Sequence, residues 1–154
     1  MCRSSRLAKR IRRLQKLPGI RLFQYVSDDG SVRRLRRRDA NAFLCKITNN
    51  QISLKDFRTL SACSQALTHL SRLDPKPSQR GKRAQIKSAL RQVAEELANT
   101  PAVCKRSYVH ALVIHAFESG RLKKLTPNGG LNGGTFEGHR LLKRILKSAS
   151  AFRA

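Results

Sequence analysis

The stretch LANTPAVCKRSY, residues 97–108, holds the clearest boundary between two helices in the chain. Thr100 is a favoured helix N-cap, and Pro101 suits a first helical turn because the missing amide N–H of proline is not needed there. The sequence therefore predicts a helix from 101 to about 118 that carries Tyr108. The helix before it is predicted to end at Ala98 and Asn99, and its apolar face repeats with the helical period at Ile86, Leu90, Val93 and Leu97.

Working outward, the rest of the chain is also predicted to be mainly helical, with one small β-hairpin. SLKDFRT, residues 53–59, starts with a capping pair of Ser53 and Asp56 and opens a helix that ends before Asp74. The hairpin is predicted from LFQYV at 22–26, the turn Asp28-Asp29-Gly30 and a return over 31–35. Further helices are expected over 3–16, after Asp39, and near the C-terminus.

The charge of the chain points to a polyanionic partner. The 154 residues include 33 Lys plus Arg against 9 Asp plus Glu, a formal net charge of +24. Each nucleic-acid phosphate neutralised by such side chains releases condensed counterions, so nucleic acid is the expected partner. We expect no membrane association, because no stretch approaches the apolar length of a span, and we expect the protein in the cytoplasm.

Metal and cofactor chemistry is not expected from the residue pattern. The cysteines lack Cys-x-x-Cys spacing and are expected to be reduced packing residues, and the histidines form no ligand pair. The GGLNGG run at 129–134 lacks the strand before it and the Lys-Ser/Thr after it that a phosphate-binding loop requires. We therefore predict no cofactor and no metal site, with all of the cysteines and most of the histidines serving packing: Cys2, Cys45, Cys63, Cys104, and His69, His110, His115 and His139.

The segments SLKDFRT and LANTPAVCKRSY together resemble the catalytic domain of type IB DNA topoisomerases of the bacterial and poxvirus branch. In that family a Lys-Asp-Leu/Phe-Arg-Thr motif supplies an arginine, and a (His/Asn)-Thr-Pro segment precedes the nucleophilic tyrosine. The resemblance implies that Arg58, Asn99 and Tyr108 are catalytic. Flanking segments support a resemblance from about Arg6 to Leu122, namely RRLQKLPG at 12–19, LFQYV at 22–26, DANAFL at 39–44 and HAFESGRL at 115–122.

Elementary chemistry agrees with these roles. A tyrosine hydroxyl ordinarily has a pKa of about 10 and needs cationic neighbours to act as a nucleophile near neutral pH. Lys105 and Arg106 are close in sequence, but a helix directs them away from the face of Tyr108, so Arg58 is the expected activating charge. A guanidinium also binds two phosphate oxygens at once and stabilises a pentacoordinate transition state. The Asn99 amide is implied to donate to a nonbridging oxygen.

Several cations are expected to contact DNA phosphates rather than bases. They come from the KDFRT motif and from basic runs along the chain, and they are Lys55, Arg36, Arg37, Lys82, Arg83, Lys105 and Arg106.

The expected domain organisation is a partial catalytic domain over 1–122, a Gly-rich linker over 123–137, and a C-terminal helix over 138–154 that is loosely attached. In the family, a further arginine and a general-acid lysine on a β-hairpin lie upstream of the segment equivalent to 6–19. The core is thus expected to be truncated at its N-terminus, with an upstream polypeptide as the partner that completes the site.

The function that the resemblance implies is relaxation of supercoils without ATP, by transient nicking of one strand and resealing through a 3′-phosphotyrosyl intermediate. One alternative is a tyrosine recombinase or integrase, which shares the catalytic fold; it has histidine where this chain has Lys55 and Leu-Gly-His where it has Leu97-Ala98-Asn99. A second alternative is an inactive DNA-binding fragment. The expected truncation at the N-terminus is what supports this second alternative. Because the resemblance is to the bacterial branch of these DNA enzymes, it also implies double-stranded DNA as the partner and the bacterial nucleoid as the cytoplasmic location.

Overall fold

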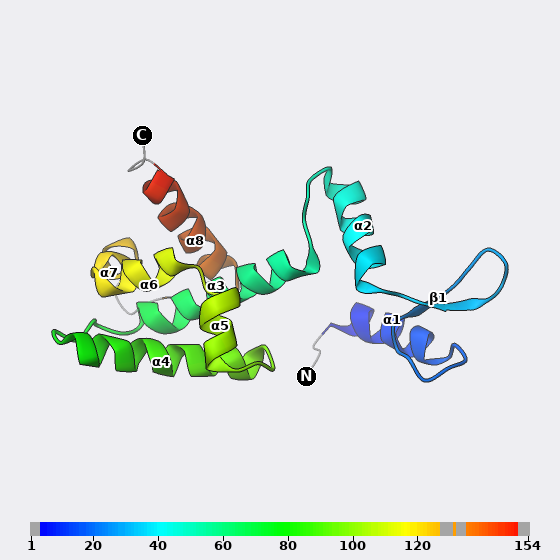
Figure 1. Cartoon of the computed structure of the whole chain (residues 1–154), viewed down its shortest axis with the longest axis horizontal. Helices are drawn as coiled ribbons and strands as arrows, with labels where there is room; N and C mark the ends of the chain where they lie inside the picture. The colour runs from blue at the N-terminus through cyan, green and yellow to red at the C-terminus, as the bar shows by residue number, and fades with distance from the viewer. Residues whose placement is uncertain (1–3, 127–130, 132–134, 151–154) are drawn as a thin grey trace. The chain divides into compact units, whose positions relative to one another are not determined.

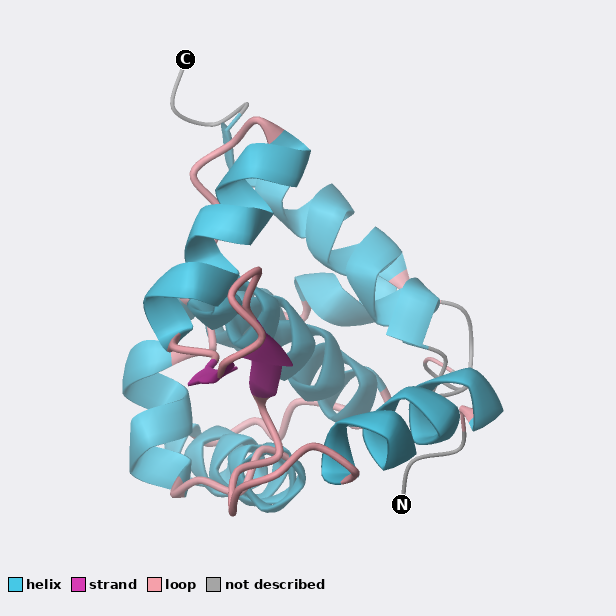
Figure 2. Ribbon diagram, turned by 90° about the vertical axis from the view of Figure 1, so that its right-hand side faces the viewer, coloured by secondary structure: helices cyan, strands magenta, loops and turns pink. Residues whose placement is uncertain are grey.

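The computed structural model describes residues 4–126, 131 and 135–150, and the contacts divide the chain into an N-terminal unit, Met1–Leu54, and a C-terminal unit, Lys55–Ala154. Helices account for nearly all of the regular structure, with one two-stranded antiparallel sheet (Figure 2). The predicted fold class is confirmed. Among the described residues, no helix combines the length and the hydropathy that a membrane span requires.

The N-terminal unit contains two helices and the hairpin (Figure 1). Its elements are α1 (Ser5–Gln15), β1 (Gln24–Val26), β2 (Val32–Arg34) and α2 (Arg37–Thr48). Ser4 caps α1, accepting a hydrogen bond from the backbone N–H of Leu7. The helix expected after Asp39 begins earlier, at Arg37, so Asp39 lies in its first turn, where its carboxylate accepts from the N–H of Arg36 at 2.8 Å. Local polar contacts therefore define both helix starts.

The hairpin pairs Tyr25 with Arg33, and its turn is closed by the side chain of Asp29. That carboxylate accepts from the backbone N–H of Ser31 at 2.8 Å and forms a 2.6 Å ion pair with Arg33. The hydroxyl of Ser31, with its N–H and Arg33, lowers the pKa of Asp29 below its usual value. Gly30 takes the left-handed conformation, φ +78°, that the turn requires.

The C-terminal unit is a helical bundle. It contains α3 (Leu54–Ser71, all but its first residue), α4 (Gln79–Glu96), α5 (Pro101–Ser107), α6 (Ala111–Glu118), α7 (Arg121–Leu125) and α8 (Thr135–Ser150). The predicted starts of α3 and α5 and the predicted end of α6 before Gly120 are confirmed. The predicted apolar face of α4 is also confirmed, because three of its four residues are buried and the fourth, Leu97, packs against the core.

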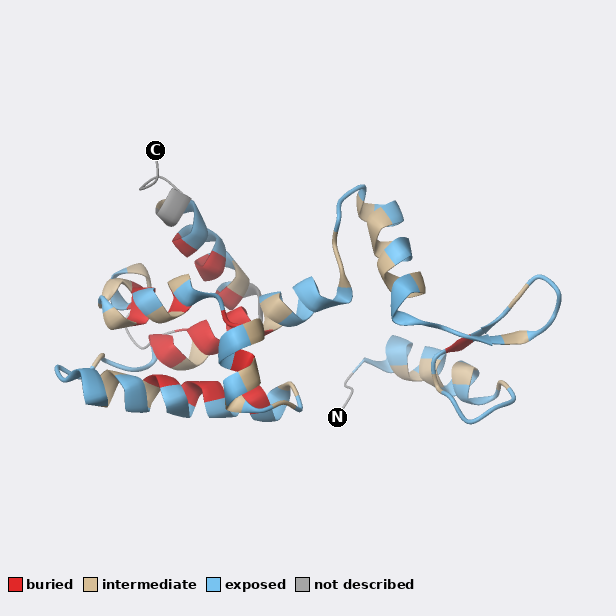
Figure 3. Ribbon diagram, in the orientation of Figure 1, coloured by how far each residue is buried: buried red, intermediate tan, exposed pale blue. Residues whose placement is uncertain are grey.

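The buried apolar core of the described residues lies entirely in the C-terminal unit, and Figure 3 shows the buried positions along its helices. Helix α3 supplies its centre with Ala62, Cys63, Ala66, Leu67 and Leu70. The other helices and the segment after α7 close around it with Ile86, Ala89, Leu90, Val93, Ala94, Cys104, Val109, Val113, Ala116, Phe117, Leu122, Leu131, Leu141, Leu142 and Ile145.

The structure corrects two expectations about helices. The predicted continuous helix over 101–118 is two helices, α5 and α6, separated at 108–110, so Tyr108 is the C-cap of α5 and not an interior helical residue. The C-terminal helix, expected to be loosely attached, buries three residues in the core, and Gly138 lies so close to α3 that a Cβ there would overlap the Ser64 side chain.

The Gly-rich linker expected over 123–137 lies partly outside the described residues, at 127–130 and 132–134. Between these two undescribed stretches, Leu131 is buried and hydrogen-bonded to the C-terminal end of α3. Its N–H donates to the hydroxyl of Ser71 at 3.1 Å, and its carbonyl accepts from Nε of Arg72, also at 3.1 Å. These two hydrogen bonds hold the backbone of Leu131 against the end of α3. The division into domains at 122 and 137 stays a prediction.

Candidate active site

Arg58 and Tyr108 lie in contact in the C-terminal unit, although 49 intervening residues separate them in sequence. The guanidinium carbon of Arg58, on the exposed first turns of α3, lies 5.2 Å from the centroid of the Tyr108 ring. A guanidinium over an aromatic face at this distance is a cation–π contact. The positive charge is therefore already beside the phenol, at the surface of the unit.

The same guanidinium also binds the segment that contains Asn99. Its Nη2 donates to the carbonyl of Leu97, the C-cap of α4, at 2.9 Å. Ala98 follows in the left-handed region at φ +49°, and the N–H of Asn99 returns to the carbonyl of Ala94 at 2.8 Å. This pattern is a Schellman motif, a common way to end a helix. Arg58 thus connects the turn before Asn99 with Tyr108.

Asn99 itself is held by its backbone. Its side chain is half-buried, and among the described residues no hydrogen bond occupies its amide. Thr100, directly after it, caps α5 by accepting from the N–H of Val103 at 3.3 Å. The Asn99 amide is consequently placed between the end of one helix and the start of the next, with both donors available to a ligand.

Cys63 holds the turn that carries Tyr108, a role that sequence reasoning missed. Its thiol donates to the Tyr108 carbonyl at 3.3 Å and accepts from the His110 N–H, also at 3.3 Å. The side chain is 1% exposed, and this burial raises the pKa of the thiol above its ordinary value. Because Cys63 and Arg58 are on the same helix, α3 sets both the tyrosine turn and the charge beside it. No motif marks this residue; only the packing of α3 against 108–110 identifies it.

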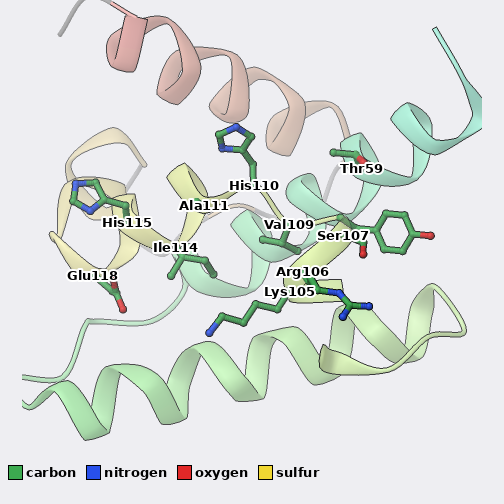
Figure 4. A pocket seen from close by; sticks show the side chains of 11 residues that line it. Thr59, Lys105, Arg106, Ser107, Val109, His110, Ala111, Ile114, His115 and Glu118 are labelled. Atoms are coloured by element: carbon green, nitrogen blue, oxygen red, sulfur yellow. The ribbon is translucent and has the colours of Figure 1, made fainter. Parts of the chain in front are cut away.

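A cavity of about 570 Å³ opens beside Tyr108, between α5 and α6. Lys105 and Arg106 line it, as do two histidines that the sequence had assigned to packing. Nδ1 of His110 accepts from the N–H of Leu112 and so caps α6. Figure 4 shows that the side chains of His110 and Lys105 point in different directions. The full lining is Thr59, Lys105, Arg106, Ser107, Tyr108, Val109, His110, Ala111, Ile114, His115 and Glu118.

The cations predicted to bind DNA fall into different settings. Lys55 is exposed on α3 one turn before Arg58, and Lys105 and Arg106 are exposed at the cavity beside Tyr108. Lys82 is different, because its ammonium donates to the carbonyl of Glu118 at 2.8 Å and ties α4 to the end of α6. The remaining three are exposed, two of them in the N-terminal unit: Arg36, Arg37 and Arg83.

Among the described residues, no cluster of three or more His, Cys, Asp or Glu side chains could hold a metal ion. The three cysteines that it describes, Cys45, Cys63 and Cys104, are free thiols.

Comparison with known proteins identifies the class to which this fold and site belong. The family described as "Eukaryotic DNA topoisomerase I, catalytic core" matches residues 3–125, most of the chain, and the chain belongs to that family of type IB topoisomerases. It is similar to the DNA topoisomerase 1B of Acanthamoeba polyphaga mimivirus, with 33% identity over 116 residues that cover 71% of this chain. The match covers 34% of the relative, so the chain spans about a third of its length.

The family assignment decides between the two enzyme classes considered from the sequence, because the matched family is the topoisomerase and not the recombinase. Arg58, Asn99 and Tyr108 all lie within the matched residues. Their individual roles, and those of the DNA-binding cations, stay predictions that the geometry motivates.

Proposed function

We propose that this chain carries the nucleophile of a type IB topoisomerase that acts on double-stranded DNA. The hydroxyl oxygen of Tyr108 attacks a backbone phosphorus, the bond from phosphorus to the 5′ oxygen breaks, and the 5′-hydroxyl leaves with a proton. Swivelling about the intact strand relaxes the duplex, and attack by the same 5′-hydroxyl releases the tyrosine. The adduct conserves the energy of the phosphodiester, so no ATP is consumed.

The observation that carries this proposal is the contact between Arg58 and Tyr108. A phosphate bound at the guanidinium would lie next to the tyrosine, and the positive charge stabilises both the phenolate and the charge that develops on the phosphoryl oxygens. In the DNA-free state one guanidinium nitrogen binds the carbonyl of Leu97, which holds the side chain in place. The donors of Asn99, two residues later, complete the proposed phosphate site.

DNA binding is proposed to depend on phosphate contacts by exposed cations, because few side chains here are placed to read base edges. Lys55, Lys105 and Arg106 surround the candidate site and are proposed to hold the strand that is cut. The affinity for duplex DNA should fall steeply with salt and differ little between sequences. A salt series on two unrelated duplexes measures both properties.

We also propose that a further polypeptide completes the site. The chain spans about a third of its viral relative, and the resemblance places another arginine and a general-acid lysine outside the matched residues. The N-terminal unit supports this proposal, because it exposes apolar side chains such as Phe23, Phe43 and Ile47 that a protein surface would cover. Relaxation by this chain alone should therefore be very slow, since proton donation contributes ~10² to 10⁴ in rate.

A DNA substrate with a 5′-thiol leaving group tests the nucleophile separately from the proton donor, because a thiolate leaves without protonation. We expect weak covalent trapping of the purified chain on this substrate. Tyr108→Phe should abolish the adduct, whereas Tyr25→Phe, which changes the other tyrosine of the chain, should not. Arg58→Ala should slow adduct formation by about 10² to 10³, the range for loss of one transition-state donor, with Arg91→Ala as the control for lost charge.

The outcomes separate the hypotheses. Salt-sensitive binding with no adduct, even on the thiol substrate, would identify an inactive DNA-binding fragment. An adduct that survives Tyr108→Phe would refute the assignment of the nucleophile. Rapid relaxation of plasmid by the chain alone would refute the proposal that another polypeptide completes the site.

A further inference from the structure

A second cavity, of about 580 Å³, lies between α4, α5 and α6 in the C-terminal unit. Its lining is mostly apolar, and the apolar part, here called its floor, contains Ile86 and Leu90 from α4, Pro101 from α5 and Ile114 from α6. The two α4 residues are each less than a tenth exposed. The cavity therefore offers a preformed apolar surface that needs no rearrangement of the core.

Cations from two helices also line this groove. Arg83 and Lys87 are one turn apart on α4, and Lys105 faces the groove from α5; all three are exposed. The one acidic side chain in the lining is Glu118, whose backbone carbonyl already binds Lys82. Three cations against one carboxylate, above an apolar floor, favour a ligand with an apolar body and a negative charge.

We propose that this groove binds a small amphipathic organic anion, such as an aromatic carboxylate or sulfonate. The volume lies within the range of roughly 300 to 1,000 Å³ typical of small-molecule sites, which are mostly apolar with a few placed polar groups. A stable protein partner would need an interface of more than about 1,000 Å². DNA phosphates would gain nothing from the apolar floor, because they are bound by cations and polar donors.

The groove adjoins the site of Tyr108. Lys105, Ile114 and Glu118 line both cavities, and Lys105 lies three residues before Tyr108 on the same short helix. A bound anion would thus contact α5, the helix that ends at the tyrosine. An effect of the ligand on adduct formation would rest on the proposed function; binding in the groove does not.

Binding is tested without DNA, with the fluorescent sulfonate 8-anilinonaphthalene-1-sulfonate as the probe. We expect saturable binding that weakens by roughly tenfold in Lys87→Glu, because the reversal removes one attraction and adds one repulsion. Arg91→Glu is the matched control: it makes the same charge change one turn further along α4, at an exposed residue that does not line the groove. Ala102→Trp should block the probe sterically, since Ala102 lines the groove and is exposed.

The neutral probe N-phenyl-1-naphthylamine separates charge from apolar contact, and it should respond to Ala102→Trp but not to Lys87→Glu. Circular dichroism checks that each variant keeps its helices. Equal weakening by Lys87→Glu and Arg91→Glu would overturn the proposal, because it would mean that only the overall charge matters. Unchanged binding in Ala102→Trp would place the probe elsewhere and overturn it as well. None of these results depends on whether Tyr108 reacts with DNA.

Discussion

The two units of this chain are ordered by different forces. In the C-terminal unit, helices α3 to α8 surround fully buried apolar side chains such as Leu67 and Phe117. In the described part of the N-terminal unit, no apolar side chain is buried, and the one buried residue is Gln24. Its amide donates to the carbonyls of Leu17 and Pro18 at 3.3 and 3.1 Å. The C-terminal unit is thus ordered by a hydrophobic core, whereas the described part of the N-terminal unit is ordered by helix caps, a turn and polar contacts.

This difference bears on function. Burial of apolar area is the dominant favourable contribution to folding, so the C-terminal unit has its own driving force and can hold Arg58 and Tyr108 in fixed positions. Hairpins and single helices are marginal in water without packing partners. Within itself, the described part of the N-terminal unit therefore has little apolar burial to stabilise it. It exposes apolar side chains at Leu7, Ile20, Phe23, Tyr25, Val26, Leu35, Phe43 and Ile47.

The largest expected effect is a direct contrast between the units. Leu67→Ala removes a fully buried side chain at the centre of α3 and should lower the free energy of unfolding by about 2–5 kcal/mol. Phe43→Ala removes a larger side chain that is 60% exposed, and it should change that free energy by roughly 0.5 kcal/mol or less. Urea unfolding followed by circular dichroism measures both. A large loss in Phe43→Ala would mean that α2 belongs to a core after all.

The second prediction tests whether α8 belongs to the core of the C-terminal unit. A Cβ at Gly138 would lie 2.9 Å from the backbone carbonyl oxygen of Ser64 and would overlap the Ser64 hydroxyl. Gly138→Ala should therefore cost about 1–3 kcal/mol from overpacking, although alanine is the better helix former. Adding Ser64→Ala should recover part of the loss, since the hydroxyl is removed and the backbone clash remains. A neutral or stabilising Gly138→Ala would show that α8 is detached.

The third prediction uses the buried thiol that holds the tyrosine turn. Burial raises the pKa of Cys63 above its ordinary value of 9.0, so the unfolded chain loses this proton at a lower pH than the folded protein does. The stability that depends on this thiol is complete below pH 9.0 and is lost as the pH rises through the folded pKa. The slope reaches at most about 1.4 kcal/mol per pH unit for one group.

Chemical unfolding at several alkaline pH values measures this slope, and Cys63→Ala provides the reference without the thiol. The variant should lose stability less steeply above pH 9.0 than the parent chain does, whatever its starting stability. Identical slopes for the two proteins would contradict a buried, neutral Cys63. Cys45, which is only half-buried and lies in the N-terminal unit, supplies a control substitution to alanine.

Helix starts could be predicted from the sequence because capping is local. Thr100 with Pro101 shows this, and so does the hairpin, whose Asp-Asp-Gly turn closes through neighbouring atoms. The break at 108–110 could not be predicted, because apolar residues continue on both sides and His110 is not a preferred N-cap. The thiol of Cys63, 45 residues earlier, binds both sides of that break, and such a long-range contact leaves no periodic signal.

In the candidate site, too, some residues could be predicted from sequence motifs and others only from tertiary contacts. The motifs pointed to Arg58, Asn99 and Tyr108, and the structure brings Arg58 against both the Tyr108 ring and the turn before Asn99. The sequence missed the residues that act through packing, because they carry no motif: Cys63 behind the tyrosine turn and His110 at the start of α6. It also treated Lys82 as a free phosphate contact, whereas the tertiary structure uses its ammonium to join two helices.

The smallest expected effect concerns the turn that joins Arg58 to Asn99. Ala98 has φ +49°, a conformation that costs an L residue roughly 1 kcal/mol and costs glycine little. Ala98→Gly should therefore raise the free energy of unfolding of the C-terminal unit by about 0.5–1 kcal/mol, reduced somewhat by the greater freedom of glycine in the unfolded chain. The Schellman bonds of Ala98 and Asn99 involve only backbone atoms, so the carbonyl of Leu97 should stay available to Arg58. Ala98→Val, which places a β-branched side chain in the same conformation, should destabilise the unit instead. If both variants unfold at the parent's urea concentration, the left-handed residue does not limit stability, and the end of α4 adapts to whichever side chain it carries.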